Sequence, residues 1–99
     1  MNKITNGKME GEIVMFRLWP EGDVVALFPE IPGDNRGFPY CTAYAHIGQH
    51  CGADYRLVIR RTKPAPRKAY RDLLAELRQI GYRNLTIRQR YYTPRQEAP

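Results

Sequence analysis

The chain has 99 residues, of which 42% are hydrophobic and 26% are charged, and its formal net charge is +6 at pH 7. These values are typical of one small globular domain and exclude an intrinsically disordered chain. The longest apolar run, residues 24–28, is far shorter than the about 20 residues of a membrane-spanning helix. We therefore predict a single domain over residues 1–99, with an ordered core at about 11–92, flexible termini and no membrane partner.

The first ten residues lack the apolar stretch of a secretory signal, which predicts a cytoplasmic protein. In the cytoplasm, Cys41 and Cys51 would be reduced thiols rather than a disulfide. A core of this size is marginal, so a homo-oligomer is an alternative to a monomer.

The charge is divided between the two halves of the chain. Residues 1–54 carry four basic and seven acidic side chains, a net charge of −3, whereas residues 55–99 carry twelve basic and three acidic ones, a net charge of +9. Arginine outnumbers lysine ten to two in the second half, and the planar guanidinium group suits phosphate or carboxylate recognition. The pattern predicts an anionic partner, or else a solvated surface that keeps a small protein soluble.

In chain order, residues 12–19 are rich in β-forming side chains and predict a strand. The sequence PEGD at residues 20–23 predicts a turn, and residues 24–28 predict a second strand that closes an antiparallel hairpin. Residues 29–39 contain three prolines and two glycines and predict a long loop.

Alternating side chains at residues 40–47 predict a third strand. The odd positions of this strand are small and apolar and should face the core: Cys41, Ala43, Ala45 and Ile47. Residues 48–54 predict an irregular segment with two glycines, and renewed alternation at residues 55–61 predicts a fourth strand.

An apolar stripe with helical spacing predicts a helix that begins near Pro66 and ends at Gly81. Residues 85–91 predict a last strand, and residues 93–99 a frayed tail. The order is β-β-β-β-α-β. It predicts an α+β fold, a two-layer sandwich in which one amphipathic helix packs on one face of a sheet of about five strands. The opposite face should then be open to solvent or to a partner.

Five sequence strings resemble a family of small uncharacterised bacterial and phage proteins. They are ALFPEIP (26–32), YAHIGQH (44–50), AD (53–54), TKPA (62–65) and LLAELRQIGY (73–82), and the similarity runs from about residue 12 to residue 88. HIGQH is the most distinctive string, and Cys51 departs from the pattern. The resemblance implies a cytoplasmic protein of bacterial, phage or mobile-element origin, and it implies no activity, cofactor or site.

The segment 41–54 contains the residue types of a zinc site, namely Cys41, His46, His50 and Cys51. Cys41 and His46 would point to opposite faces of one strand, and Gly48 opposes a helix that would bring the two histidines together. The chain also lacks a C-x-x-C pair. We therefore predict no metal and no cofactor.

A catalytic alternative uses the same segment. Two histidines with a carboxylate can perform general acid–base chemistry near neutral pH, and loops on a rigid sheet often carry such groups. The candidate catalytic residues are His46, His50, Asp54, Glu30 and Tyr44. The competing and favoured interpretation is that the histidines make structural hydrogen bonds.

The second candidate site is the basic and aromatic half of the chain. If the strands 55–61 and 85–91 are neighbours, four arginines could share the open sheet face, and Arg61 lies nearby in sequence. The candidate nucleic-acid-binding residues are thus Arg56, Arg60, Arg61, Arg88 and Arg90. The Tyr91–Tyr92 pair nearby could stack on exposed bases. The favoured function is thus a non-catalytic, basic binding module that contacts nucleic acid. The alternatives are a hydrolase-like or metal-assisted enzyme, and an accessory factor that binds another protein through a sheet edge or the proline-rich loop.

Overall fold

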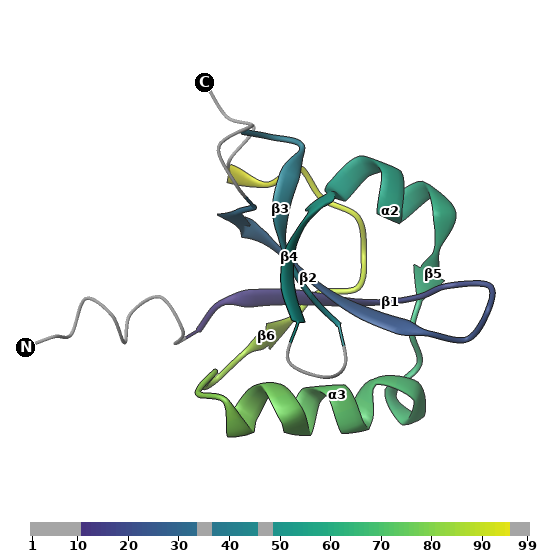
Figure 1. Cartoon of the computed structure of the whole chain (residues 1–99), viewed down its shortest axis with the longest axis vertical. Coiled ribbons are helices and arrows are strands. Elements are labelled where there is room, and N and C mark those ends of the chain that lie inside the picture. Colours follow the sequence, from purple (N-terminus) through teal and green to yellow (C-terminus); the bar gives the residue numbers. More distant parts are fainter. Residues whose placement is uncertain (1–10, 34–36, 46–48, 96–99) are drawn as a thin grey trace, which may run out of the picture.

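The computed structural model describes residues 11–33, 37–45 and 49–95. Within them the strands form one sheet in the order β4-β3-β2-β1-β5, and β6 also pairs with β1 (Figure 1). The elements are β1 (Ile13–Leu18), β2 (Val24–Pro32), β3 (Tyr40–Ala45), β4 (Gln49–Asp54), α2 (Tyr55–Arg61), β5 (Lys63–Pro64), α3 (Arg67–Gln79) and β6 (Thr86–Ile87). The predicted α+β class is confirmed.

The N-terminal hairpin and the long helix also agree with the prediction. β1 and β2 pair antiparallel, and the turn between them has Gly22 at a φ of 106°, where a side chain would be strained. α3 begins directly after Pro66 and is followed by Gly81, whose φ of 123° turns the chain away from the helix. Among the described residues, neither helix has the length and apolarity needed to cross a bilayer.

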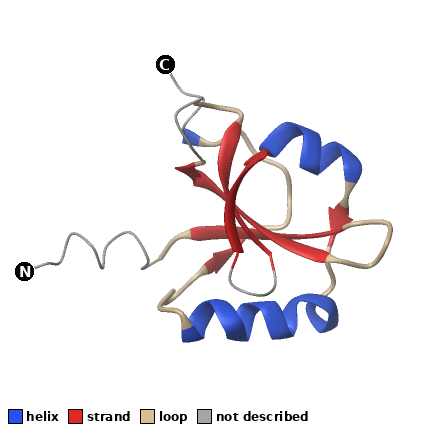
Figure 2. Cartoon of the chain, viewed as in Figure 1, coloured by secondary structure: helices blue, strands red, loops and turns tan. Residues whose placement is uncertain are grey.

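Both faces of the sheet are covered, because successive side chains of the interior strand β1 point to opposite faces and those of Val14, Met15 and Phe16 are all buried. Val14 and Phe16 of β1 belong to a buried cluster with three leucines of α3. Met15 belongs to a second cluster with Tyr55 and Val58 of α2. Figure 2 shows the two helices on opposite sides of the strands. The prediction of one helix and one open sheet face is therefore wrong.

Residues 55–61 form the helix α2 and not the predicted strand. Asp54 is the N-cap, and its carboxylate accepts a hydrogen bond from the backbone N–H of Leu57 at 3.1 Å. Tyr55 and Val58, three residues apart, are the buried residues of this helix. The alternation of Tyr55, Leu57 and Ile59 with other side chains also fits a strand, and the aspartate cap favours the helix.

Strand structure also occurs where the sequence predicted irregular structure or a loop. β4 occupies residues that we predicted to be irregular, and it pairs antiparallel with β3 from Tyr40↔Asp54 to Ala45↔Gln49. β2 continues to Pro32, through the start of the predicted loop, with a register shift between Phe28 and Pro32 that accommodates its prolines. The last two positions of the predicted strand 40–47 lie outside the described residues.

β6 ends at Ile87 instead of residue 91 because a side chain takes over the pairing with β1. The amide of Gln89 accepts a hydrogen bond from the N–H of Phe16 at 3.0 Å. It also donates to the carbonyl oxygens of Phe16, at 3.3 Å, and of Ala65, at 3.0 Å. Gln89 thus joins β1 to the residue that follows β5, and gives the buried backbone of Phe16 a partner.

We expect Gln89→Ala to lower the free energy of unfolding by about 1–3 kcal/mol, because the buried N–H of Phe16 would lose its acceptor. Urea denaturation followed by circular dichroism measures this loss. The control is Gln79→Ala at the exposed end of α3, which should change stability by no more than about 0.5 kcal/mol. Equal stability of the two variants would contradict the role given to Gln89.

Candidate nucleic-acid interface

A buried arginine fixes the C-terminal end of α2 to the sheet. The Arg17 side chain is 5% exposed, and its Nε donates to Oγ1 of Thr62 at 2.9 Å. Its Nη2 donates to the carbonyl oxygens of Thr62, at 2.8 Å, and of Ile59, at 3.3 Å. Burial lowers the pKa of Arg17, but a guanidinium group starts from so high a pKa that it stays charged. Its positive charge therefore lies at the negative end of the helix.

A buried tyrosine joins the other end of α2 to residues 88–95, which we call the C-terminal segment. The Tyr55 hydroxyl donates to the carbonyl oxygen of Tyr92 at 2.8 Å. The ring of Tyr55 stacks on that of Tyr91, with centroids 5.6 Å apart and planes 20° apart. Burial raises the pKa of Tyr55 to about 12, so the hydroxyl remains a hydrogen-bond donor at neutral pH. The C-terminal segment consequently runs beside α2 (Figure 1).

Glu30 anchors the far end of the C-terminal segment. Its carboxylate accepts hydrogen bonds from the Tyr92 hydroxyl at 2.8 Å and from the N–H of Arg95 at 2.9 and 3.2 Å. Burial, together with the bond to Glu30, raises the pKa of Tyr92. Pro94 is fully buried, and the Arg88 guanidinium lies 4.0 Å from the Tyr92 ring centroid. The packed part of the chain therefore reaches Arg95, beyond the predicted limit of about residue 92.

Arginine and tyrosine side chains meet where α2 borders the C-terminal segment. Arg56, Ile59, Arg60 and Tyr91 line a shallow hollow of about 280 Å³, which we call the arginine–tyrosine surface. Arg56 and Arg60 are one helical turn apart and therefore lie on the same side of α2. Tyr91 is 50% exposed, and the Arg56 guanidinium is held 5.1 Å from the Phe38 ring centroid.

The structure brings together two of the five predicted arginines. Arg56 and Arg60 share a face as predicted, but the face belongs to a helix that covers the sheet. Arg88 packs on Tyr92, while Arg61 and Arg90 are exposed and do not line the hollow. Ile59 was not among the predicted site residues, and its position between Arg56 and Arg60 on a helix is the signal that could have identified it.

The catalytic candidates that the structure describes do not converge. The Tyr44 side chain is buried against α3, and its hydroxyl donates to the Glu76 carboxylate. Asp54 caps α2, and Glu30, which lies in β2 and not in a loop, holds the C-terminal segment. The two helices lie on opposite faces of the sheet, so Tyr44 and Asp54 serve different layers.

The side chains of the two histidine candidates, His46 and His50, are outside the part of the chain that the structure describes. His46 lies outside the described residues. His50 pairs with Tyr44 in the β3–β4 register, and its side chain is likewise outside the description. Within residues 11–33, 37–45 and 49–95, no group of three histidine, cysteine or acidic side chains could hold a metal ion.

The two cysteines are free thiols in different environments. Cys41 is buried in the cluster beneath α2, and this burial raises its pKa to about 12. Cys51 is exposed on the outermost strand β4. Of the two, Cys51 is therefore the thiol that reagents in solution can reach. The raised pKa of Cys41 lowers its reactivity further, since a thiol reacts as its thiolate.

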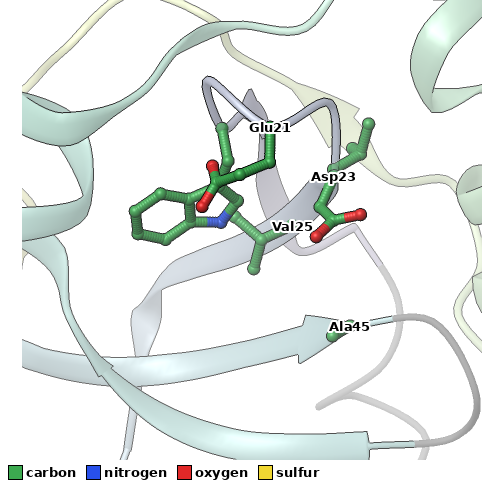
Figure 3. Close-up of a pocket in the computed structure, with 6 residues that line it drawn as sticks. Glu21, Asp23, Val25 and Ala45 are labelled. Carbon is green, nitrogen blue, oxygen red and sulfur yellow. The ribbon is translucent and has the colours of Figure 1, made fainter.

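A second hollow lies at the turn between β1 and β2 and has the opposite charge. It measures about 470 Å³ and is lined by Trp19, Glu21, Asp23, Val24, Val25 and Ala45. Figure 3 shows the carboxylates of Glu21 and Asp23 on the turn, above Val25 and Ala45 of neighbouring strands. The acidic first half of the chain thus contributes a hollow that repels anions, and none of its residues lines the arginine–tyrosine surface.

Comparison of the chain with protein families, with curated proteins and with solved structures finds no match. The resemblance described for residues 12–88 therefore stays a prediction, and the function has to be argued from the residues themselves.

We expect Asp54→Ala to lower the free energy of unfolding by about 1 kcal/mol, because the N–H of Leu57 loses its cap. Asp54→Asn should retain most of this stability, since asparagine caps helices as well as aspartate does. Thermal unfolding of both variants makes the comparison. Equal losses in the two would contradict the capping role and point to a role for the charge of Asp54.

We expect Ellman's reagent at pH 8 to modify Cys51 rapidly and Cys41 only after unfolding. The reasons are the exposure of Cys51 and the burial and raised pKa of Cys41. Cys51→Ser should abolish the rapid phase and leave the slow one. Rapid modification of a thiol in the folded Cys51→Ser variant would contradict the burial of Cys41.

Proposed function

We propose that this protein is a non-catalytic module that binds nucleic acid through the arginine–tyrosine surface. The observation that carries the proposal is the hollow that Arg56 and Arg60 line together with the half-exposed Tyr91. Guanidinium groups present several N–H donors in a plane and form strong, charge-assisted bonds to phosphate oxygens. The aromatic ring offers a flat apolar surface beside them.

The charge distribution supports the same partner. The sequence of α2, YRLVIRR, contains three arginines and no carboxylate, and residues 55–99 have a net charge of +9. A basic surface on a molecule with an acidic first half steers anions toward one side. We further propose that the protein acts in the cytoplasm, where nucleic acid is accessible and the thiols of Cys41 and Cys51 stay reduced.

The size of the hollow favours a polymer over a small metabolite. At about 280 Å³, it is slightly smaller than the roughly 300–1,000 Å³ that pockets for complete small ligands occupy. The hollow can enclose one part of a ligand while the rest of the ligand extends over the surrounding surface. A nucleic acid strand, with its repeated phosphates and bases, fits this requirement.

We expect Arg56→Ala/Arg60→Ala to weaken binding to labelled oligonucleotides about tenfold or more at low salt. If each arginine contacts one phosphate, the slope of log Kd against log salt should fall by about 2. Fluorescence anisotropy measures both quantities. Arg67→Ala/Arg71→Ala is the matched control, because it removes the same charge from exposed positions on α3, on the other face of the sheet.

Two results would contradict the proposal. The first is that the wild-type protein does not bind single- or double-stranded oligonucleotides at about 100 µM protein and low salt, where even non-specific nucleic-acid binding is measurable. The second is that both double variants lose affinity equally, because binding would then depend on net charge alone and not on this surface.

A further inference from the structure

We propose that the arginine–tyrosine surface takes nucleic acid as a single strand, with one unpaired base stacked on Tyr91 and the adjacent phosphates bound by Arg56 and Arg60. This inference rests on the proposed function and deepens it. It assigns a strand state to the ligand and a separate task to each of the three side chains.

The Tyr91 ring has support on one side and solvent on the other. Its inner face stacks on Tyr55, with ring centroids 5.6 Å apart and planes 20° apart. Tyr55 is itself fully buried, and its hydroxyl is bonded to the carbonyl oxygen of Tyr92, the next residue. Tyr91 as a whole is 50% exposed, so a ligand can reach the part of the ring that Tyr55 does not cover. The ring is therefore supported by a buried aromatic side chain before any ligand arrives.

A fixed and half-exposed aromatic ring is a stacking platform. An incoming base would bury apolar surface on the outer face of Tyr91 without first immobilising the ring, which avoids part of the entropic cost of binding. Stacking on an aromatic side chain tolerates every base, since each base has a π-face. We therefore expect little preference for sequence at this position.

The arginines share the hollow with Tyr91, and we assign to them the phosphates next to that base. Arg56 and Arg60 line the same hollow as Tyr91, one turn apart on α2. The Arg56 guanidinium rests against the Phe38 ring at 5.1 Å, which limits its range of positions. Ile59 also lines the hollow, and its apolar side chain suits the face of a base better than a phosphate.

The same geometry disfavours a duplex. Within a double helix the two faces of each base already stack on neighbouring pairs, so Tyr91 could reach a base only after that base had been unpaired. α2 has seven residues and lies along the sheet, held at its two ends by Tyr55 and Arg17. It therefore does not project from the protein as helices that read the major groove do.

The test compares Tyr91→Leu with Tyr91→Phe on three labelled probes of about ten nucleotides. The probes are oligo-dT, its duplex with oligo-dA, and an oligo-dT strand in which abasic sites replace the bases. Leucine removes the aromatic ring and keeps an apolar side chain, whereas phenylalanine keeps the ring. Unfolding temperatures, measured on the same samples, establish that both variants are folded.

We expect Tyr91→Leu to weaken binding to oligo-dT by roughly 5- to 150-fold, the loss of one stacked base. Binding of the abasic strand should not change, and neither should the salt slope, because no phosphate contact is removed. Tyr91→Phe should bind oligo-dT like the wild type. The duplex should bind the wild type more weakly than the single strand does.

Two results would overturn the inference: equal effects of Tyr91→Leu on the normal and the abasic strand, or tighter binding of the duplex. These outcomes are distinguishable from failure of the proposed function. If Arg56→Ala/Arg60→Ala loses affinity while Tyr91→Leu does not, nucleic-acid binding stands and stacking falls. If neither variant affects binding, both proposals fall.

Discussion

The hydrogen bonds of Arg17 are the interaction on which the second layer of the molecule depends. They join the charged side chain of Arg17, on strand β1, to the carbonyl oxygens of Ile59 and Thr62 at the C-terminal end of α2. Without Arg17, the carbonyl oxygens of Ile59 and Thr62 would lose a charged hydrogen-bond donor, and the helix end would be less stable because water has little access to it. A seven-residue helix is too short to be stable in isolation, so its position depends on such tertiary contacts.

The C-terminal segment depends on contacts of the same kind. It has little regular structure after Ile87, yet Gln89 and Tyr92 form hydrogen bonds and Pro94 is buried. Their partners lie on β1, on α2 and on β2, far away in sequence. Because Tyr92 is tied at both its carbonyl and its hydroxyl, the neighbouring Tyr91 ring is held over α2. The candidate site is thus a product of long-range hydrogen bonds.

This origin explains what the sequence could and could not predict. Local signals, namely the turn at Gly22 and the apolar stripe that ends at Gly81, predicted the hairpin and α3 correctly. β4 escaped prediction because an outermost strand has a polar sequence, QHCGAD, and it is stabilised by pairing with β3. The segment 55–61 fits both the strand and the helix period, and the helix could be predicted only by recognising Asp54 as its N-cap. The arginines were identified by charge, but their surface could not be, because it depends on the contact between Tyr55 and Tyr91.

The buried Arg17 and the exposed Arg60 and Arg61 all lie near the C-terminal end of α2. The end of a helix attracts cations, and Arg60 and Arg61 in the last turn of α2 could fold back onto its carbonyl oxygens. Arg17 already occupies two of the acceptors there, and the Thr62 hydroxyl donates to the carbonyl oxygen of Val58 at 2.6 Å. With these acceptors satisfied from the interior, Arg60 and Arg61 remain exposed at the surface. A buried cation on β1 thereby binds the helix end toward which the exposed arginines of the last turn would otherwise fold.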